Sequence, residues 1–387
     1  MMSLMSLQGV FQGSGKQRVI GIGFLTFGLV GVTLSIYGPA LLAFQDSFGI
    51  GQSAAGLVVS AHFLGAFTAI VCSGLIVSHF GYRRPMIIAA SLLVIGATVV
   101  ILGFDWTMVL LGAGLIGLGM GFLDVSVNLL VVRSFEDGGA PAMNLLHTTF
   151  GVGAVAGPLL VAMFLPSFRP AFVFTAIAGA ALLWFVWRLR EPPAAPSPIR
   201  GLGGSWIRMF AFCLLFFFYV GVEVGIGSWE PVHLEPSFGS GRAAALTALY
   251  WGALTVGRLV CVPISALVST RRLMLFSSGL GVLAILFAQY IVLAPYAYAL
   301  VGFALAPIFP TALVWLEEVF PGRAEMLTPL VIATAMIAPI IISPLIGIVI
   351  ETGSTKDIPT ALGLLTGVLL MVVIWLRWSP RKSGIKG

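Results

Sequence analysis

The stretch "GLIVSHFGYRRPM" (residues 74–86) joins two long apolar segments of the chain through a short turn that carries two adjacent arginines. A second stretch, "VPISALVSTRRLML" (residues 262–275), places an Arg-Arg pair at the same point between two other apolar segments. Apolar segments of roughly 20 residues predict membrane-spanning helices. The two matching loops therefore predict an all-α membrane protein in which one plan occurs twice.

The composition supports this interpretation over the whole length of 387 residues. Hydrophobic residues make up 59% of the chain and charged residues 9%, whereas soluble domains carry about 25% charged residues. The net charge of +6 does not indicate nucleic acid, because the basic residues lie at the ends of apolar segments. Cys72, Cys213 and Cys261 lie inside such segments, so we expect neither a disulfide framework nor a metal site.

Breaks at charges and turn residues divide the chain into twelve expected spans. The Pro-rich stretch "RLREPPAAPSPIRGLGG" (residues 188–204) lies between the sixth and the seventh span. It predicts an N-terminal six-helix bundle (1–189), a linker (190–205) and a C-terminal six-helix bundle (206–387). The expected spans are 19–44, 52–79, 85–104, 107–133, 140–165, 170–189, 206–235, 243–269, 273–293, 296–319, 324–350 and 358–378.

The distribution of Lys and Arg orients these spans. With both termini on the cytoplasmic side, 16 of the 20 basic residues fall in cytoplasmic segments, Arg169, Arg242 and Lys356 fall in outer segments, and Arg258 lies within a span. Cytoplasmic loops carry this kind of excess. We therefore expect both termini in the cytoplasm, in a multi-pass protein of a bacterial-type inner membrane.

The loop at residues 74–86 resembles the signature G-x-x-x-D-R-x-G-R-R of the major facilitator superfamily, with Gly74, Arg83 and Arg84 as candidate gating residues. Ser78 stands where that family usually has Asp, and Tyr82 replaces an Arg. The resemblance implies two pseudo-symmetric six-helix bundles and secondary transport, which agrees with the internal repeat.

The densest set of polar residues inside the apolar segments lies in spans four and five. Asp124 and Asn128 are four residues apart on one helix face, and Asn144 and His147 are three apart on another. At 1.5 Å per residue, Asp124 and His147 lie about 14 Å and about 10 Å from the cytoplasmic ends of their helices. A carboxylate and an imidazole at similar depth could share a proton, so both are candidate proton-coupling residues. A purely structural polar clamp is the alternative.

Span seven reads "FFFYVGVEVGIGSWEPVHL" (residues 216–234). Tyr219 and Glu223 lie four residues apart and are candidate substrate ligands, whereas Glu230 near the outer end is expected in a solvated vestibule. The alternative for Glu223 is a structural ion pair with Arg258 of span eight, because a buried Arg seldom goes unpaired. Lone polar residues such as His62 and Gln289 are expected in helix–helix contacts.

Aromatic residues and prolines complete the set of candidates. Aromatic rings stack on the apolar faces of sugars but also gather at membrane interfaces; among Tyr37, Tyr250, Trp251 and Trp315, we take Trp251 as a candidate ligand. Pro158 in "GVGAVAGPLL" (residues 151–160) is a candidate hinge. The paired prolines of "ALAPIFPTAL" (304–313) and "APIIISPLIG" (338–347) are expected to bend or loosen their helices.

Three stretches together resemble the fucose–galactose–glucose:proton symporter family. "GFLDVSVNLL" (121–130) and "APAMNLLHTTFGVGAVAGPLL" (140–160) are similar to its span four–five signature, and "YVGVEVGIGSW" (219–229) to its span seven signature. The positions that match are Asp124, Asn128, Asn144, His147, Phe150, Gly151, Tyr219, Gly221, Glu223, Gly227, Ser228 and Trp229.

This resemblance implies uptake of a monosaccharide with protons, with Asp124 as the proton carrier and the amides of Asn128 and Asn144 on the sugar. Fucose permease has a second acid in helix 1, whereas "LSIYGPALLAF" (34–44) has none, which favours a glucose-type neutral substrate. Sodium remains an alternative coupling ion, and a proton-antiport exporter of drugs or metabolites is an alternative function on the same fold. We expect no enzymatic activity, no cofactor and a monomer.

Overall fold

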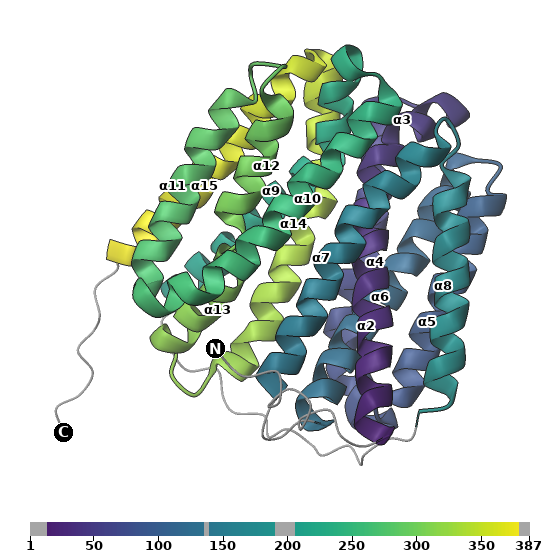
Figure 1. Cartoon of the computed structure of the whole chain (residues 1–387), viewed down its shortest axis with the longest axis vertical. Coiled ribbons are helices and arrows are strands. Elements are labelled where there is room, and N and C mark those ends of the chain that lie inside the picture. The colour runs from purple at the N-terminus through teal and green to yellow at the C-terminus, as the bar shows by residue number, and fades with distance from the viewer. Residues whose placement is uncertain (1–13, 135–138, 190–205, 379–387) are drawn as a thin grey trace.

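The computed structural model describes residues 14–134, 139–189 and 206–378, almost entirely as α-helices (Figure 1). The first group of helices is α2 (Ser14–Ser35), α3 (Tyr37–Phe48), α4 (Gln52–Phe80), α5 (Arg83–Leu102), α6 (Trp106–Ser134), α7 (Gly139–Phe164) and α8 (Arg169–Trp187). The second is α9 (Trp206–Phe238), α10 (Ser240–Leu267), α11 (Thr270–Phe287), α12 (Ala294–Leu305), α13 (Ile308–Val319), α14 (Ala324–Thr352), the short 3₁₀ helix η1 (Thr355–Asp357) and α15 (Ile358–Trp378).

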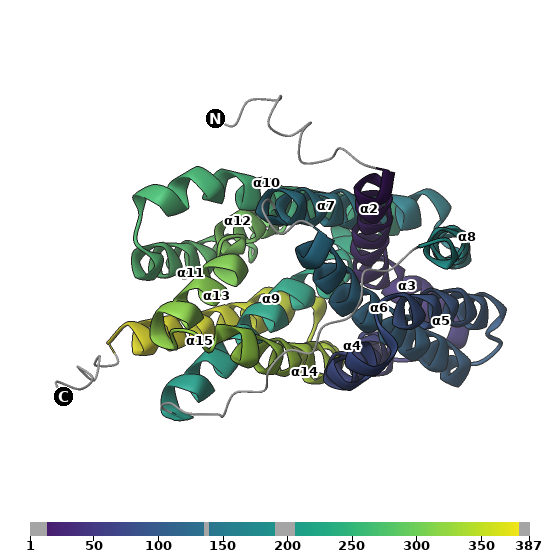
Figure 2. The same cartoon turned by 90° about the horizontal axis from the view of Figure 1, so that it is seen from below.

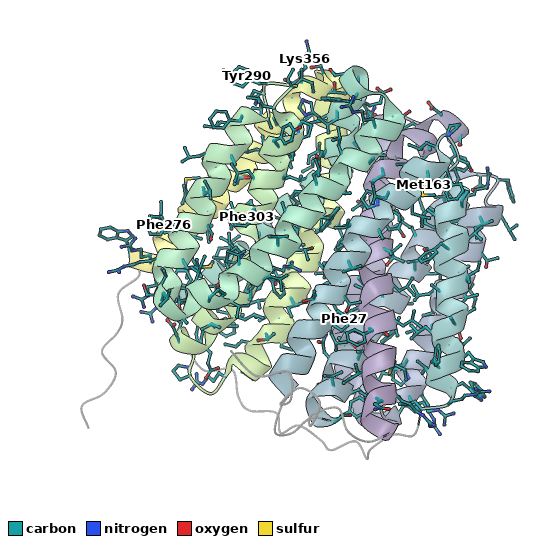
Figure 3. All side chains as sticks on the ribbon, viewed as in Figure 1. Phe27, Met163, Phe276, Tyr290, Phe303 and Lys356 are labelled. Carbon is teal, nitrogen blue, oxygen red and sulfur yellow. The ribbon has the colours of Figure 1, made fainter. Side chains whose placement is uncertain are left out.

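The helices are of a length and polarity that suit a lipid bilayer. In the part of the chain that the structure describes, eleven helical segments are long and apolar enough to cross a membrane, and Thr148–Phe164 of α7 is a shorter apolar segment. Large apolar side chains such as Met163 and Phe276 are more than 70% exposed and point outward from the bundle (Figure 3). The chain is therefore a multi-pass helical membrane protein. The count of twelve spans and the cytoplasmic termini stay predictions.

Two of the expected spans are each divided into two helices. The first span is divided between α2 and α3 near Ser35, because Pro39 has no N–H to donate to the carbonyl of Ser35. The tenth is divided between α12 and α13 around Pro307, which removes a helical hydrogen bond in the same way. The expected loosening by prolines is confirmed there. In contrast, α14 continues as one helix through Pro329, Pro339 and Pro344.

Successive membrane helices run in opposite directions, so the connections between them lie at two ends of the bundle. Arg83, Arg188, Arg271, Arg323 and Arg377 lie at or beside helix ends on one side, here called the basic end. The opposite side, the distal end, contains the connections at residues 49–51, 103–105, 165–168 and 288–293 and the segment 353–357; Tyr290 and Lys356 mark it at the top of Figure 3.

The helices form two groups that lie side by side. Helices α2–α8 make up the N-terminal group and α9–α15 the C-terminal group, as the purple-to-teal and green-to-yellow ribbons show from the side and from below (Figures 1 and 2). Three helix pairs contribute most of the contact between the groups: α4 with α14, α7 with α10 and α3 with α9. The division of the chain into two domains remains the interpretation drawn from the repeat.

Small residues allow helices within the N-terminal group to approach closely. Along the contact between α4 and α6, a Cβ added at Gly117 would overlap the backbone carbonyl of His62, and one added at Gly65 would overlap that of Gly114. Transmembrane helices associate through such contacts, since lipid offers no hydrophobic driving force between helices.

The distal end is closed by contacts of the same kind between the two groups. Gly38 of α3 lies against the backbone of Gly227 and Ser228 of α9, and Gly347 of α14 lies against Ser53 of α4. The hydroxyl of Ser60 also donates to the carbonyl oxygen of Ile340 at 2.7 Å. On α4 these contacts fall in the first third of the helix, so they hold the groups together toward the distal end.

Glu351 adds a polar contact to this closure. Its Oε1 accepts hydrogen bonds from the backbone N–H of Ser53 at 2.9 Å and from the Ser53 hydroxyl at 3.0 Å. The first amides of a helix have no partner within the helix and favour a negative charge. A carboxylate of the C-terminal group therefore caps a helix of the N-terminal group.

Replacing Gly117 by Ala tests the close packing of α4 and α6. We expect the added methyl group to force the helices apart and to destabilise the protein by about 1–3 kcal/mol, as overpacking of a tight interior does. Thermal unfolding in detergent measures this as a lower midpoint. Gly21→Ala is the matched control, because nothing lies within 4 Å of a Cβ added at Gly21. Equal midpoints for the two variants would contradict the packing argument.

Candidate functional site

Asp124 of α6 lies in a partly buried position within a membrane helix, bonded to the residue one turn further along. The side-chain amide of Asn128 donates to the backbone oxygen of Asp124 at 2.8 Å and to its carboxylate Oδ1 at 3.1 Å. Among the residues that the structure describes, no cation pairs with this carboxylate. Asn128 thus orients Asp124 without neutralising it.

The predicted partners in span five cannot be compared with this geometry. Asn144 and His147 belong to α7, but their side chains lie outside the described part of the structure. Helix α7 packs mainly along α2 and α10 and touches α6 less. The cluster of four polar groups, and the shared proton of Asp124 and His147, therefore stay predictions.

Glu223, which is buried, and Arg258, which is partly buried, form an ion pair between α9 and α10. The Arg258 Nη2 lies 3.0 Å from the Glu223 Oε1. The side chain of Glu223 is 9% exposed and that of Arg258 is 24% exposed. This is the structural pairing that the sequence analysis left open for Glu223; its role as a substrate ligand remains a prediction.

Aromatic side chains surround this ion pair. Tyr219 lies one turn before Glu223 and interacts electrostatically with both charges. The Tyr250 hydroxyl donates to the backbone oxygen of Glu223 at 3.0 Å. From the N-terminal group, the Phe150 ring lies 5.5 Å from the guanidinium carbon of Arg258, a distance that allows a cation–π contact. Phe150 matched the family signature, but sequence reasoning gave it no role, because the contact depends on how the two groups face each other.

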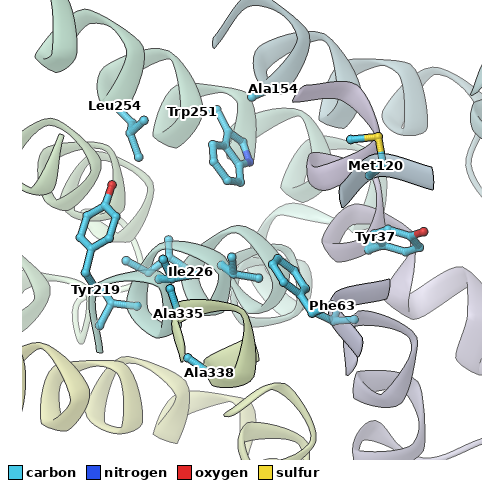
Figure 4. Packing of buried hydrophobic residues seen from close by; sticks show 14 of the residues in the cluster. Tyr37, Phe63, Met120, Ala154, Tyr219, Ile226, Trp251, Leu254, Ala335 and Ala338 are labelled. Carbon is cyan, nitrogen blue, oxygen red and sulfur yellow. The ribbon is translucent and has the colours of Figure 1, made fainter. Parts of the chain in front are cut away.

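Trp251 of α10 lies between the groups, with Tyr219 on one side and Met120 and Tyr37 on the other (Figure 4). It is buried against Gly227 of α9. Its indole N–H has no acceptor among the described residues. An indole nitrogen can only donate, so Trp251 offers an apolar ring and an unused donor side by side.

Of the two lone polar residues, His62 lies in a helix–helix contact, as predicted, whereas Gln289 lies in the connection after α11 and contacts α15 from there. The Nδ1 of His62 in α4 lies 3.2 Å from the hydroxyl of Tyr37 in α3. The Gln289 amide, just after α11, donates to the Thr360 hydroxyl of α15 at 3.0 Å.

The expectation for Glu230 is wrong. Its side chain is 0% exposed, so it is not a solvated vestibule residue. The seven-residue spacing from Glu223 places it on the same face of α9, directed into the C-terminal group rather than toward water. Nearby, the Tyr298 hydroxyl of α12 lies 2.9 Å from the Nδ1 of His233. The sequence did carry a signal for burial, since α9 continues as an apolar helix to Phe238.

The candidate gating residues occupy separate places. Arg83 donates to the backbone oxygen of Trp187 and so connects the start of α5 to the end of α8, while Arg84 lies over the Phe80 ring at 5.9 Å. Pro158 lies inside the continuous helix α7. Gly74 lies in α4 at a position outside the part described in atomic detail. A gating role for each of them remains a prediction.

Together these residues provide a membrane-embedded acid held by an amide, a paired charge and an aromatic wall with an unused donor. Across residues 14–134, 139–189 and 206–378, no three His, Cys, Asp or Glu side chains come together in a way that could hold a metal ion. The unused indole donor can hydrogen-bond a polar solute, and the carboxylate without a cation partner can bind a proton.

Removing one member of the ion pair tests how much it stabilises the protein. We expect Arg258→Met to cost about 3–5 kcal/mol of stability, because it leaves the Glu223 carboxylate buried and unpaired. The double variant Glu223→Leu with Arg258→Met is expected to recover most of this loss, measured as the thermal unfolding midpoint in detergent. Arg272→Met removes an exposed arginine and is the matched control. A single Arg258 variant as stable as that control would contradict the expectation.

Comparison with solved structures shows the same fold in sugar transporters. The D-xylose–proton symporter structure is 13% identical, with a TM-score of 0.78, and covers 96% of this chain and 100% of its own. The structure of FucP in the outward conformation is 16% identical, with a TM-score of 0.65, and covers 93% and 99%.

Curated relatives are similar over most of their length. The glucose/mannose transporter GlcP of Bacillus subtilis is 23% identical over 345 residues, which is 84% of this chain and 85% of that protein. The human sodium-dependent glucose transporter 1 is 25% identical over 409 residues, 91% of this chain and 78% of that protein. Residues 23–245, more than half of the chain, match the family model described as Major Facilitator Superfamily. The chain belongs to the Major Facilitator Superfamily and is a transporter rather than an enzyme.

Proposed function

We propose that this protein is a proton-coupled symporter of a monosaccharide or similar neutral solute. The observation that carries the proposal is the partly buried carboxylate of Asp124, bonded to Asn128 and without a cation partner in the described residues. An ionised carboxylate inside a membrane helix is costly unless it is paired or hydrated. Binding a proton removes that cost.

The cost of an ionised carboxylate inside the membrane predicts the order of steps in the transport cycle. With the site open to the distal side, Asp124 takes up a proton and the solute binds between the two helix groups. Once the carboxylate is neutral, the loaded protein closes its distal end and opens its basic end, where both ligands leave. The contacts of Gly38, Gly347 and Glu351 at the distal end support the existence of a distally closed state. By the charge bias of membrane loops, the basic end faces the cytoplasm.

Relatives and local chemistry support a sugar as the solute. A glucose/mannose transporter and sodium-dependent glucose transporters are similar to this chain over most of its length. The Trp251 ring and its unused N–H suit a sugar, which has an apolar face and a rim of hydroxyl groups. Export of a cationic drug is less well supported, because the carboxylate of Glu223 is already neutralised by Arg258.

Asp124→Asn tests the proton role. The amide cannot carry the proton, so we expect the variant to lose proton-driven accumulation of solute while it keeps counterflow exchange, which needs no net proton movement. Both are measured with radiolabelled sugar in proteoliposomes. The control is Asp105→Asn, which changes an exposed carboxylate whose hydrogen bond to the Met108 N–H an asparagine can also make. Normal accumulation by the Asp124 variant would overturn the proposed coupling.

A substrate panel tests the class of solute and the coupling ion. We expect glucose or a related hexose to trigger proton entry into liposomes that carry the protein, measured with an enclosed pH-sensitive dye. Lipophilic cations are expected to give little or no flux, because Arg258 already neutralises Glu223, the candidate acid for a cationic drug. Proton flux with drugs alone would indicate an exporter. Hexose uptake that requires sodium rather than a pH gradient would show that sodium, not the proton, is the coupling ion.

A further inference from the structure

Glu230 is a carboxylate inside the C-terminal group that the cycle described above does not use. Its side chain is 0% exposed, and neither carboxylate oxygen has a hydrogen-bond partner among the described residues. An ionised carboxylate buried without a partner is strongly unfavourable, so such a group binds a proton or a cation. We therefore expect the Glu230 carboxylate to bind a proton or a cation that neutralises its charge.

The side chains around Glu230 do not supply that charge. Tyr298 of α12 and Tyr250 of α10 lie close enough to feel the charge of the Glu230 carboxylate. His233 lies one turn further along α9. The nearby cation on these helices, Arg258, is already paired with Glu223. The hydroxyl groups of Tyr250 and Tyr298 are engaged with the Glu223 backbone and with His233.

This environment favours a proton over a metal cation. A metal cation needs several oxygen ligands around it, whereas the two hydroxyl groups near Glu230 are already used in hydrogen bonds. A proton needs only the carboxylate itself. The protonated acid is neutral and fits the apolar interior between α9, α10 and α12.

Glu230 also lies close to a contact that closes the distal end. It follows by three residues Gly227, whose backbone lies against Gly38 of α3. If α3 separated from α9, this turn of α9 would lose its contact with the N-terminal group. The carboxylate faces α10 and α12 and lies one turn along α9 from a contact that must break when the distal end opens.

We propose that Glu230 is a second proton-binding site, located in the C-terminal group, which holds its proton while the distal end is closed and releases it to the distal side when that end opens. The proposal rests on the alternating-access cycle described under the proposed function. It does not depend on Asp124, which lies in the other helix group.

The direction of the pH dependence follows from the states that bind the proton. The closed state holds the proton and the open state releases it, so acid favours closure and alkali favours opening. A single titrating site can change the ratio of open to closed protein by up to about tenfold per pH unit. A neutral residue at position 230 removes this dependence and leaves the distal end closed.

Spin labels across the distal end test the proposal without any sugar present. Labels are placed at Ser167 and Tyr290, which are exposed in the distal connections of the two groups, after the three native cysteines are replaced. We expect the distance distribution of the otherwise unchanged protein to shift toward the open state as pH rises. Glu230→Gln and Glu230→Met are both expected to remain closed at every pH. Glu235→Gln, at a partly exposed position on the same helix, is the control and is expected to keep the response.

Three results would overturn the proposal. The first is a pH response that is absent from the parent protein or unchanged in both Glu230 variants. The second is a response that His233→Gln removes while the Glu230 variants retain it, which would assign the proton to the imidazole. The third is a shift that follows sodium concentration rather than pH. Because no sugar is used, loss of this proposal leaves the Asp124 experiment unaffected, and failure of sugar transport leaves this measurement valid.

Discussion

The cost of a charge inside the membrane is the constraint on which the rest of this structure depends. Three carboxylates inside the membrane helices differ in how this cost is offset. Glu223 is neutralised by Arg258 at 3.0 Å, Asp124 is held by an amide that cannot neutralise it, and Glu230 has no partner among the described residues. A paired carboxylate is fixed in one state, whereas an unpaired one has two states that differ by a proton. This difference separates the paired Glu223 from Asp124 and Glu230, the two carboxylates that the proposals use for proton binding.

Close approach of helix backbones is the second constraint. Within the N-terminal group, Gly65 and Gly117 let α4 and α6 meet along much of their length. Between the groups, Gly38 and Gly347 make similar contacts, but only toward the distal end. At these two positions the groups meet backbone to backbone, without large side chains between them.

Much of the fold could be predicted from the sequence, because apolar length and the repeated Arg-Arg loops are local signals. The division of the first span near Ser35 was missed, since Pro39 lies in an otherwise unbroken apolar stretch. The pairing of Glu223 with Arg258 was foreseen only as an alternative, because the choice between a solute and a partner depends on helix rotation. The burial of Glu230 was missed for a different reason: its position near a helix end suggested water, but α10 and α12 cover that turn of α9.

The Glu351 carboxylate at the start of α4 has a consequence for how the distal end moves. Helix α4 begins in the N-terminal group, but the Ser53 N–H and hydroxyl in its first turn donate to a carboxylate of the C-terminal group. If the groups separate, the Ser53 amide loses this acceptor, and the first turn of α4 is weakened. In the proposed cycle, the two groups would therefore not move as fully rigid bodies. The start of α4 would lose order when the distal end opens and regain it on closure, so the order of one helical turn would report which side of the protein is open.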